Sequence, residues 1–124
     1  MSTHCGIAIK TEKGYCGIYC HFEGYYDYMY PMLTQNYNSA ELAANLISKG
    51  NASYIDKLLN PTSDYHKFVT PEPGVSMFYY RDRGEDWSDV APKLYTKEEF
   101  LSTFYHAYIF EDGMWNAYLG SEKI

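Results

Sequence analysis

Two arginines lie two positions apart in the stretch YYRDRGEDW, and the chain has no other arginine. The residues that lead into this stretch, VSMFYYR from Val75 to Arg81, alternate in the manner of a β-strand. Residues i and i+2 of a strand project to the same side, with about 7 Å between their Cα atoms. The guanidinium groups of Arg81 and Arg83 would then converge on one anion, and that span suits a pyrophosphate.

The neighbours of the two arginines could complete a nucleotide site. Asp82 either points away or folds back to orient an arginine, and Glu85 can accept a hydrogen bond from a ribose hydroxyl or an adenine amine. The rings of Tyr79 and Trp87 can stack against a base or a guanidinium plane. The competing interpretation is that the arginines only form surface ion pairs with these carboxylates and Asp86, which contribute about 0 to 1 kcal/mol. The residues alone leave both interpretations open.

A second group of candidate ligand-binding side chains lies in the run YCGIYCHF, residues 15–22. A strand here would place Tyr19 and His21 side by side on one face, where they offer stacking and hydrogen-bonding groups. Cys20 would point to the opposite face. It therefore cannot act with His21 as a nucleophile and its base.

Other common chemistry is missing from the sequence. There is neither a G-x-S-x-G nucleophile elbow nor the glycine-lysine pattern of a phosphate-binding loop. The cysteines Cys5, Cys16 and Cys20 lack the spacing of a zinc site and are expected to be thiols that serve as small apolar residues. The four histidines show no metal-ligand spacing either. We therefore predict no catalytic residue, no metal and no cofactor.

Composition limits the partners that the chain can bind. Its 124 residues predict a single domain, residues 1–124, and its formal net charge of −6 argues against binding to DNA or RNA polymers or to an anionic membrane surface. No apolar run approaches the roughly 20 residues that span a bilayer, and the N-terminus does not have the features of a signal peptide, so we expect a cytosolic protein. Aromatic residues make up 19% of the chain and 15 of them are tyrosine, which is typical of recognition surfaces.

Alternation and turn residues predict two β-hairpins. Cys5, Ile7 and Ile9 alternate with smaller or polar residues, TEKG supplies a turn, and the alternation resumes over residues 15–22. The chain closes on the runs YHAYIF and MWNAYL, which are joined by a turn that contains Asp112-Gly113. With VSMFYYR this makes five strands.

Two helices are predicted after the first hairpin. Asp27 could cap a short helix whose first turn would have to accommodate Pro31. Asn38 and Glu41 have capping-box spacing for a second helix, which would end at Gly50.

The rest of the chain predicts further short elements. A helix is expected over residues 52–59, a loop over residues 61–74, and another helix from the capping-box pair Thr96 and Glu99 through Phe104. The fold class is therefore α+β, a single domain in which a small, mainly antiparallel sheet is combined with two or three short helices. Its tyrosine-rich edges favour pairing with another copy of the chain, so a homo-oligomer is expected.

Four segments resemble one family of small phage proteins. They are STHCGIAIKTEKGYCGIYCHFEGY near the N-terminus, the pattern YN..E....LI..G from Tyr37 to Gly50, YYRDRGEDW, and YIFEDGMWNAY near the C-terminus. These segments are similar to those of the first-described anti-Thoeris (Thoeris anti-defence) sponge family, and they occur in the same order over most of the chain.

The resemblance implies a sponge that binds cyclic ADP-ribose isomers (glycocyclic ADP-ribose) without cleaving them. Bacterial TIR-domain immune proteins make these signals, so a sponge would block Thoeris immunity from the cytoplasm of the infected host. Members of the family are dimers that assemble into hexamers, with nucleotide pockets between protomers, and some also hold cyclic oligonucleotides at separate sites. Carried over here, Arg81 and Arg83 would contact the phosphates, and Tyr19, His21 and Tyr25 would face the base and the riboses.

The chain departs from the family pattern at two positions. His4 stands where an arginine is expected, and Tyr26 where a proline is expected after the glycine-tyrosine pair. If a cyclic oligonucleotide site depends on that arginine, this chain does not have the charge for it. Two other functions remain open: an enzyme that degrades the same signal with His21 or Glu85 as general base, and a protein-binding inhibitor that docks through its tyrosines.

Overall fold

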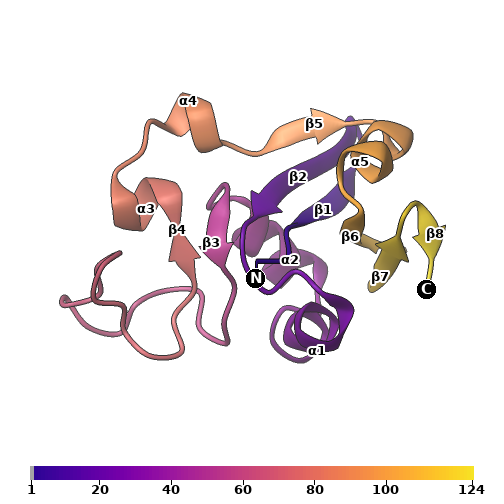
Figure 1. Cartoon of the computed structure of the whole chain (residues 1–124). Helices are drawn as coiled ribbons and strands as arrows, with labels where there is room; N and C mark the ends of the chain where they lie inside the picture. Colours follow the sequence, from indigo (N-terminus) through magenta and orange to yellow (C-terminus); the bar gives the residue numbers. More distant parts are fainter. Residues whose placement is uncertain (1) are drawn as a thin grey trace.

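The N-terminal hairpin lies at the centre of the sheet (Figure 1). In the computed structural model, which describes residues 2–124, β1 (Cys5–Thr11) pairs antiparallel with β2 (Gly14–Cys20). The register places Cys5 opposite Cys20, and both side chains are fully buried. The predicted hairpin is therefore confirmed, and these two cysteines pack in the core as small apolar residues.

Eight strands of the described residues form one mixed sheet in the order β4-β3-β2-β1-β6-β7-β8, with β5 paired to β2. The remaining strands are β3 (Ala52–Tyr54), β4 (Met77–Phe78), β5 (Lys93–Tyr95), β6 (His106–Glu111), β7 (Met114–Leu119) and β8 (Glu122–Lys123). Only the pairs β1–β6 and β2–β3 are parallel. The predicted α+β fold with a mainly antiparallel sheet is confirmed, although the structure has more strands than the five that were predicted.

The C-terminal hairpin of β6 and β7 also follows its sequence signal. Its two turn residues, Asp112 and Gly113, have φ angles of 57° and 78°. Positive φ at both central residues matches the right-handed twist of the strands that they join. Trp115 in β7 is buried, and its indole N–H donates to the carbonyl oxygen of Tyr37 at 2.9 Å. This bond ties the hairpin to the helical layer.

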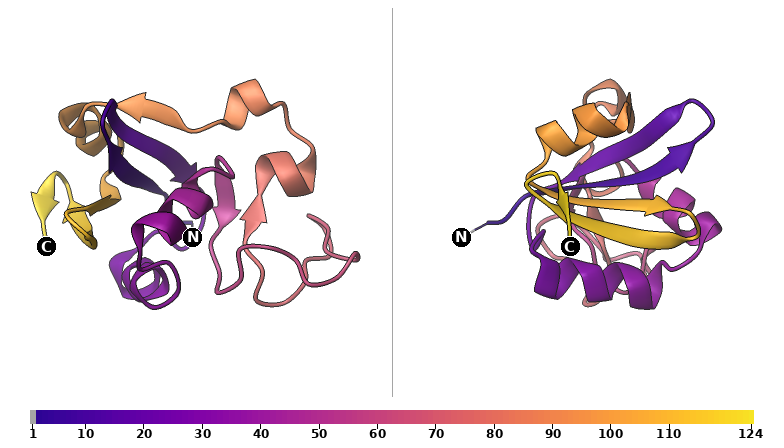
Figure 2. Two further views of the ribbon diagram at one scale, coloured as in Figure 1. Left: turned by 180° about the vertical axis from the view of Figure 1, so that it is seen from behind. Right: turned by 90° about the vertical axis from the view of Figure 1, so that its right-hand side faces the viewer.

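The helices cover both faces of the sheet (Figure 2). They are α1 (Tyr26–Asn36), α2 (Ala40–Ile47), α3 (Tyr79–Arg83), α4 (Trp87–Val90) and α5 (Lys97–Thr103). The right-hand view shows α5 on one side of the central strands and α1 on the other. None of the helices in residues 2–124 has the length and apolar character that a membrane span requires.

Close approach of α5 to the sheet depends on glycine. A Cβ atom built on Gly17 of β2 would lie 2.7 Å from the ring of Phe100, and one built on Gly6 of β1 would lie 2.8 Å from it. Such distances are too short for carbon atoms that are not bonded, so the two glycines leave the space that this ring fills. Phe100 is fully buried as a result and anchors the smaller of two apolar clusters.

The helix caps were predicted correctly at one of three positions. Thr96 and Glu99 form the expected capping box, with hydrogen bonds of 2.8 and 3.1 Å. The second helix is capped instead by Ser39, one residue after the predicted Asn38, because the Ser39 hydroxyl accepts the hydrogen bond from Leu42 N–H. The N-cap position of α1 is Tyr25, so the predicted cap residue, Asp27, lies within the first turn of the helix, where its charge still favours the helix dipole.

The middle of the chain differs most from the prediction. The helix expected over residues 52–59 is wrong, because Ala52 pairs with Cys20 on one side and Phe78 on the other and so forms β3. The strand expected over residues 75–81 is wrong beyond Phe78, where the chain turns into α3. Residues 61–74 form the predicted loop, which lies beside β4 (Figure 1).

Candidate functional site

The helical turn of α3 separates the two arginines. Its backbone starts where the Asp82 carboxylate accepts a hydrogen bond from Phe78 N–H at 2.8 Å, and it ends at Gly84, whose φ is 76°. Residues two apart on an α-helix are rotated by about 200° around its axis. Arg81 and Arg83 therefore leave the backbone in different directions, and the argument that both forks converge on one anion does not hold.

The guanidinium group of Arg81 is occupied by partners within the chain. It donates to the carbonyl oxygens of Ser76 at 2.8 Å and Leu59 at 2.7 Å, and to both carboxylate oxygens of Asp82 at 2.8 and 2.9 Å. Only 23% of the Arg81 side chain is exposed. These bonds join α3 to the segment before the loop, and they realise the expectation that Asp82 folds back to orient an arginine.

Asp82 and His66 continue this network into the loop. The Asp82 side chain is 3% exposed, and its Oδ1 lies 3.4 Å from Nε2 of His66. Burial would raise the pKa of Asp82, but hydrogen bonds from Arg81 and from the Phe78 N–H, together with the charge of Arg81, lower it below its ordinary value. Nδ1 of His66 accepts a hydrogen bond from Glu72 N–H at 2.9 Å. Asp82 is therefore held as a carboxylate inside the fold.

Glu72 closes the loop on itself. Its carboxylate accepts hydrogen bonds from the backbone N–H groups of Thr62 and Ser63 at 3.1 and 3.0 Å, and from both hydroxyl groups. These side-chain hydrogen bonds lower the pKa of Glu72. The polar groups on the Arg81 side of α3 are thus bonded within the fold, except Nε2 of His66, which lies near Asp82 but is buried without a hydrogen-bond partner among the described residues.

Arg83 has a different environment. Its side chain is 52% exposed, and its Nε lies 3.1 Å from the carboxylate of Glu85. The guanidinium carbon is 5.0 Å from the ring centre of Phe68 and 5.6 Å from that of Tyr79. Within residues 2–124 its two terminal nitrogens make no hydrogen bond, so they can bind an anion while the two rings fix the side chain.

Asn51 connects this region to β2. Its backbone carbonyl accepts a hydrogen bond from Tyr79 N–H at 3.2 Å, and its side-chain oxygen accepts one from Tyr19 N–H at 2.9 Å. The pKa of Tyr19 is raised by burial and by the neighbouring phenol of Tyr79. The structure therefore brings together three predicted site residues, Tyr19, Tyr79 and Arg83.

Tyr19 also belongs to a group of side chains that we call the histidine cluster, which consists of His4, Tyr19 and His21. The Tyr19 hydroxyl lies 2.6 Å from Nδ1 of His21 and 3.1 Å from Nδ1 of His4. The His4 Nδ1 is also 2.7 Å from the carbonyl oxygen of His21, and the two imidazole rings are 4.5 Å apart. The predicted pair Tyr19 and His21 is thus confirmed as neighbours, and His4 joins them.

Two other predicted residues pack elsewhere. Trp87 makes an edge contact with Tyr80, with ring centres 5.0 Å apart, and Tyr25 packs against Tyr28 at 6.2 Å. The pKa of Tyr25 is raised by its hydrogen bond with Glu23 and by burial. Neither ring takes part in the contacts that surround Arg83.

Sequence reasoning missed Phe68 and Asn51, and it treated His4 only as a departure from a family pattern. Phe68 lies in an irregular loop, where no periodicity marks an aromatic residue as a partner of Arg83. Asn51 follows Gly50, which has a φ of 83° and ends the turn after α2. A polar residue directly after such a glycine was the only available signal.

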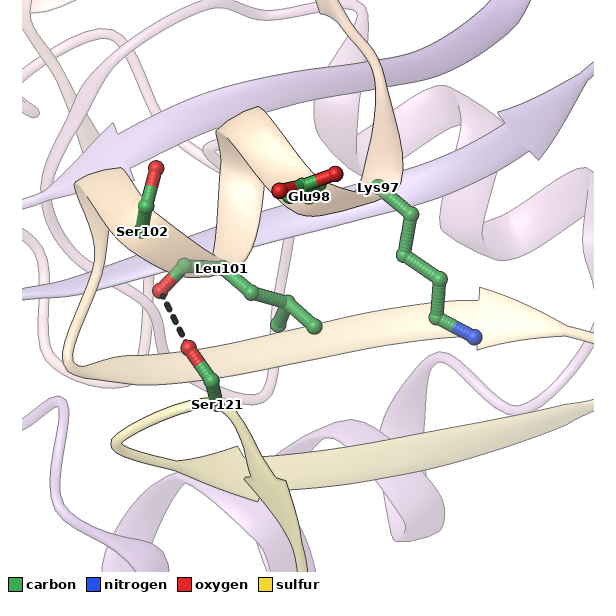
Figure 3. A pocket seen from close by; sticks show the side chains of 5 residues that line it. All are labelled: Lys97, Glu98, Leu101, Ser102 and Ser121. Atoms are coloured by element: carbon green, nitrogen blue, oxygen red, sulfur yellow. Dashed lines mark hydrogen bonds between the residues drawn. The ribbon is translucent and has the colours of Figure 1, made fainter.

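One surface hollow is separate from these residues. It has a volume of about 610 Å³ and is lined by Lys97, Glu98, Leu101, Ser102 and Ser121 (Figure 3). The Lys97 ammonium is paired with Glu111 at 3.0 Å, and the Ser121 hydroxyl donates to the carbonyl oxygen of Leu101 at 3.3 Å. A second hollow of about 450 Å³ is lined by Thr11, Glu12, Lys13, Cys16 and Leu94. Because the Lys97 ammonium and the Ser121 hydroxyl of the first hollow already have partners, we place the candidate site at Arg83.

Comparisons of the chain with known protein families, curated proteins and solved structures find no match. Within residues 2–124 there is also no group of three histidine, cysteine, aspartate or glutamate side chains that could hold a metal ion. The side chains around Arg83 and the histidine cluster are therefore the features that bear on function.

Proposed function

We propose that the protein is a sponge that binds cyclic ADP-ribose-type nucleotides without cleaving them. In the cytoplasm of an infected bacterium it would keep these signals from activating Thoeris immunity, as the resemblance to the anti-Thoeris family implies. The observation that carries the proposal is Arg83, a half-exposed guanidinium group held over Phe68 and Tyr79 beside Tyr19.

The chemistry of this region suits such a ligand. The free terminal nitrogens of Arg83 match the geometry of phosphate oxygens, and aromatic rings beside them can stack on a base. A chain with a net charge of −6 can bind a small anion only where positive charge is concentrated locally. Arg83 supplies part of that charge through terminal nitrogens that make no hydrogen bond in the described residues, whereas the guanidinium group of Arg81 is already satisfied.

A second copy of the chain would complete the site. One arginine is little charge for a pyrophosphate, so we propose that the pocket closes between protomers and that each protomer contributes its Arg83 region. The homo-oligomer implied by the resemblance, a dimer that assembles into a hexamer, would supply such an interface. Burial between two protomers would also exclude water from the phosphates and strengthen the charge-assisted hydrogen bonds.

Calorimetric titration with cyclic ADP-ribose isomers, including the products of an active TIR enzyme, tests the proposal. We expect tight binding by the natural protein and a loss of at least tenfold in affinity for Arg83→Ala, about the effect of one charged hydrogen bond. Lys123→Ala, which removes an exposed cation from the distant strand β8, should bind normally. Arg83→Lys keeps the charge but not the fork and should bind with intermediate affinity.

The fate of the ligand separates a sponge from an enzyme. After incubation the protein is denatured and the released small molecules are identified by mass spectrometry. Intact ligand in stoichiometric amount supports a sponge, whereas its conversion to products would show an enzyme. If no nucleotide binds or raises the melting temperature, a tyrosine-rich protein-binding inhibitor becomes the better explanation.

A further inference from the structure

The hydrogen bonds of the histidine cluster fix where its protons lie. Nδ1 of His4 is 2.7 Å from the carbonyl oxygen of His21. A carbonyl oxygen can only accept a hydrogen bond, so Nδ1 of His4 must carry the hydrogen. The neutral His4 ring then has its lone pair on Nε2.

The hydrogen bonds of Tyr19 bear on where the hydrogen of the His21 ring lies. The Tyr19 oxygen lies 3.1 Å from Nδ1 of His4, which already carries a hydrogen, and 2.6 Å from Nδ1 of His21. Burial and the neighbouring Tyr79 raise the pKa of Tyr19, so the phenol keeps its own hydrogen. Among the described residues that hydrogen has no acceptor other than Nδ1 of His21. A hydrogen bond from the phenol to Nδ1 of His21 places the hydrogen of the neutral His21 ring on Nε2.

The cluster thus presents an acceptor, His4 Nε2, beside a donor, His21 Nε2–H. The ring centres are 4.5 Å apart and the ring planes are tilted by 31°, so the two nitrogens belong to adjacent rings. His4 is exposed and His21 is half-buried, and neither Nε2 has a hydrogen-bond partner within residues 2–124. Phe22 makes an edge contact with His21 at 4.4 Å and is 42% exposed, which adds an apolar surface at the same place.

We propose that His4 and His21 together recognise the amino edge of an adenine base. Adenine carries the N6 amino donor next to a ring nitrogen that accepts, which is the complement of this pair. The exposed ring of Phe22 can lie against the base. The inference rests on the proposed function, since the base would belong to the ligand whose phosphates Arg83 binds.

The histidine cluster and Arg83 are connected through the fold. Tyr19 of the histidine cluster is linked through Asn51 to Tyr79, whose ring lies under Arg83. His21 and Phe22 donate backbone hydrogen bonds to Ala52 and Ser53 of β3 at 3.0 and 2.8 Å, so the end of β2 is held next to β3. Tyr19 acts here as a positioning residue, because its phenol fixes His21 as a donor.

The test compares the affinity of the protein for two ligands that differ only in their base. Affinities are measured for a cyclic ADP-ribose isomer closed through a ribose hydroxyl and for its hypoxanthine counterpart, in which an oxygen acceptor replaces the N6 amine. That oxygen would face the lone pair of His4. We expect the adenine form to bind about tenfold or more tightly, as is typical for reading a base edge with two hydrogen bonds.

Three variants test which side chains cause the preference for adenine over hypoxanthine. His4→Phe keeps a ring but removes the acceptor, so the adenine preference should disappear, whereas His4→Gln supplies an amide oxygen and should restore much of it. Tyr19→Phe removes the hydroxyl group that fixes the tautomer of His21. It should weaken the preference for adenine by about threefold or more, while affinity for the hypoxanthine form changes little. Melting temperatures establish that each variant is folded before its affinities are compared.

The outcomes distinguish this inference from the proposed function. Equal affinities of the natural protein for both rings would overturn the base-reading assignment and leave the sponge intact. A full adenine preference in folded His4→Phe would overturn it as well. If neither ligand binds, the proposed function is wrong, and the assignment of His4 and His21 to the base is wrong as well.

Discussion

The two sides of α3 carry the same kind of side chain in opposite conditions. Arg81 donates to two backbone carbonyls and a buried carboxylate, whereas Arg83 lies over two rings with one partly exposed carboxylate as its ion-pair partner. The two environments indicate that the role of an arginine depends on whether its five N–H donors already have hydrogen-bond partners. A satisfied fork stabilises the fold, and an unsatisfied fork held in place by aromatic rings is ready for an anion.

Arg81→Ala should have the largest effect on stability. The substitution leaves Asp82 buried without its main partner and frees two carbonyl oxygens, so we expect the free energy of unfolding to fall by about 3 kcal/mol. Urea denaturation measures the change. The double variant Arg81→Ala with Asp82→Asn removes the stranded charge and should recover part of the loss. A change below about 1 kcal/mol for Arg81→Ala would contradict a structural role for this side chain.

Asp82→Asn should cost about 2 kcal/mol at pH 7, because it removes a charged acceptor of several hydrogen bonds. The effect depends on pH. The folded-state pKa of Asp82 is lowered, so its contribution is fully present above the unfolded value of about 3.9 and is lost as the pH falls through the folded value. The difference in unfolding free energy between the natural protein and Asp82→Asn should therefore shrink below pH 4.

A matched control for this pH dependence is Glu122→Gln, which changes an exposed carboxylate in β8. Its unfolding free energy should follow that of the natural protein across the same acidic range. If Asp82→Asn showed an unchanged destabilisation at pH 2 to 3, the low pKa of Asp82 would not be the cause.

Gly84→Ala tests the backbone at the end of α3, directly after Arg83. The φ of 76° is unfavourable for alanine, but a Cβ atom there would meet no atom within 4 Å. The cost should therefore come from the backbone alone, about 1 kcal/mol, and Gly84→Asn should cost less because asparagine tolerates this conformation. Thermal denaturation compares the two variants, and equal losses would argue against backbone strain as the cause.

Arg83→Ala should have the smallest effect on stability, below about 1 kcal/mol, since exposed ion pairs and cation–π contacts contribute little. The same variant is expected to lose ligand affinity. Unfolding by urea and titration with ligand on one preparation separate the two effects. A stability loss as large as that of Arg81→Ala would mean that the two sides of α3 do not differ as proposed.

Local sequence signals predicted the parts of the fold that need no distant partner. The capping box of Thr96 and Glu99 forms within one turn, and Asp112-Gly113 joins two strands that are neighbours in the chain. Prediction failed for residues 52–59 because β3 exists only through pairing with β2 and β4. It failed after Phe78 because the turn of α3 forms where the Asp82 carboxylate accepts a hydrogen bond from Phe78 N–H. No local pattern of Ala52 or Tyr54 contains that information.

The candidate site divides in the same way. Alternation alone predicted that Tyr19 and His21 lie on one face. In the structure the Tyr19 hydroxyl lies 2.6 Å from Nδ1 of His21. The direction of the two arginines could not be predicted, because the turn of α3 depends on where Asp82 finds its hydrogen bonds. Phe68 comes to Arg83 from a loop whose shape depends on Glu72 and His66.

The sequence alone was enough to predict the fold class, both hairpins, the helix α5 and the proximity of Tyr19 to His21. Each of these follows from side-chain alternation or capping between residues close in the chain. Tertiary contacts, by contrast, satisfy the donors of Arg81 and leave the terminal nitrogens of Arg83 without a hydrogen bond in residues 2–124. The reason is physical: the carbonyl oxygens of Leu59 and Ser76 that satisfy Arg81 reach it only after β3, β4 and the loop have packed together.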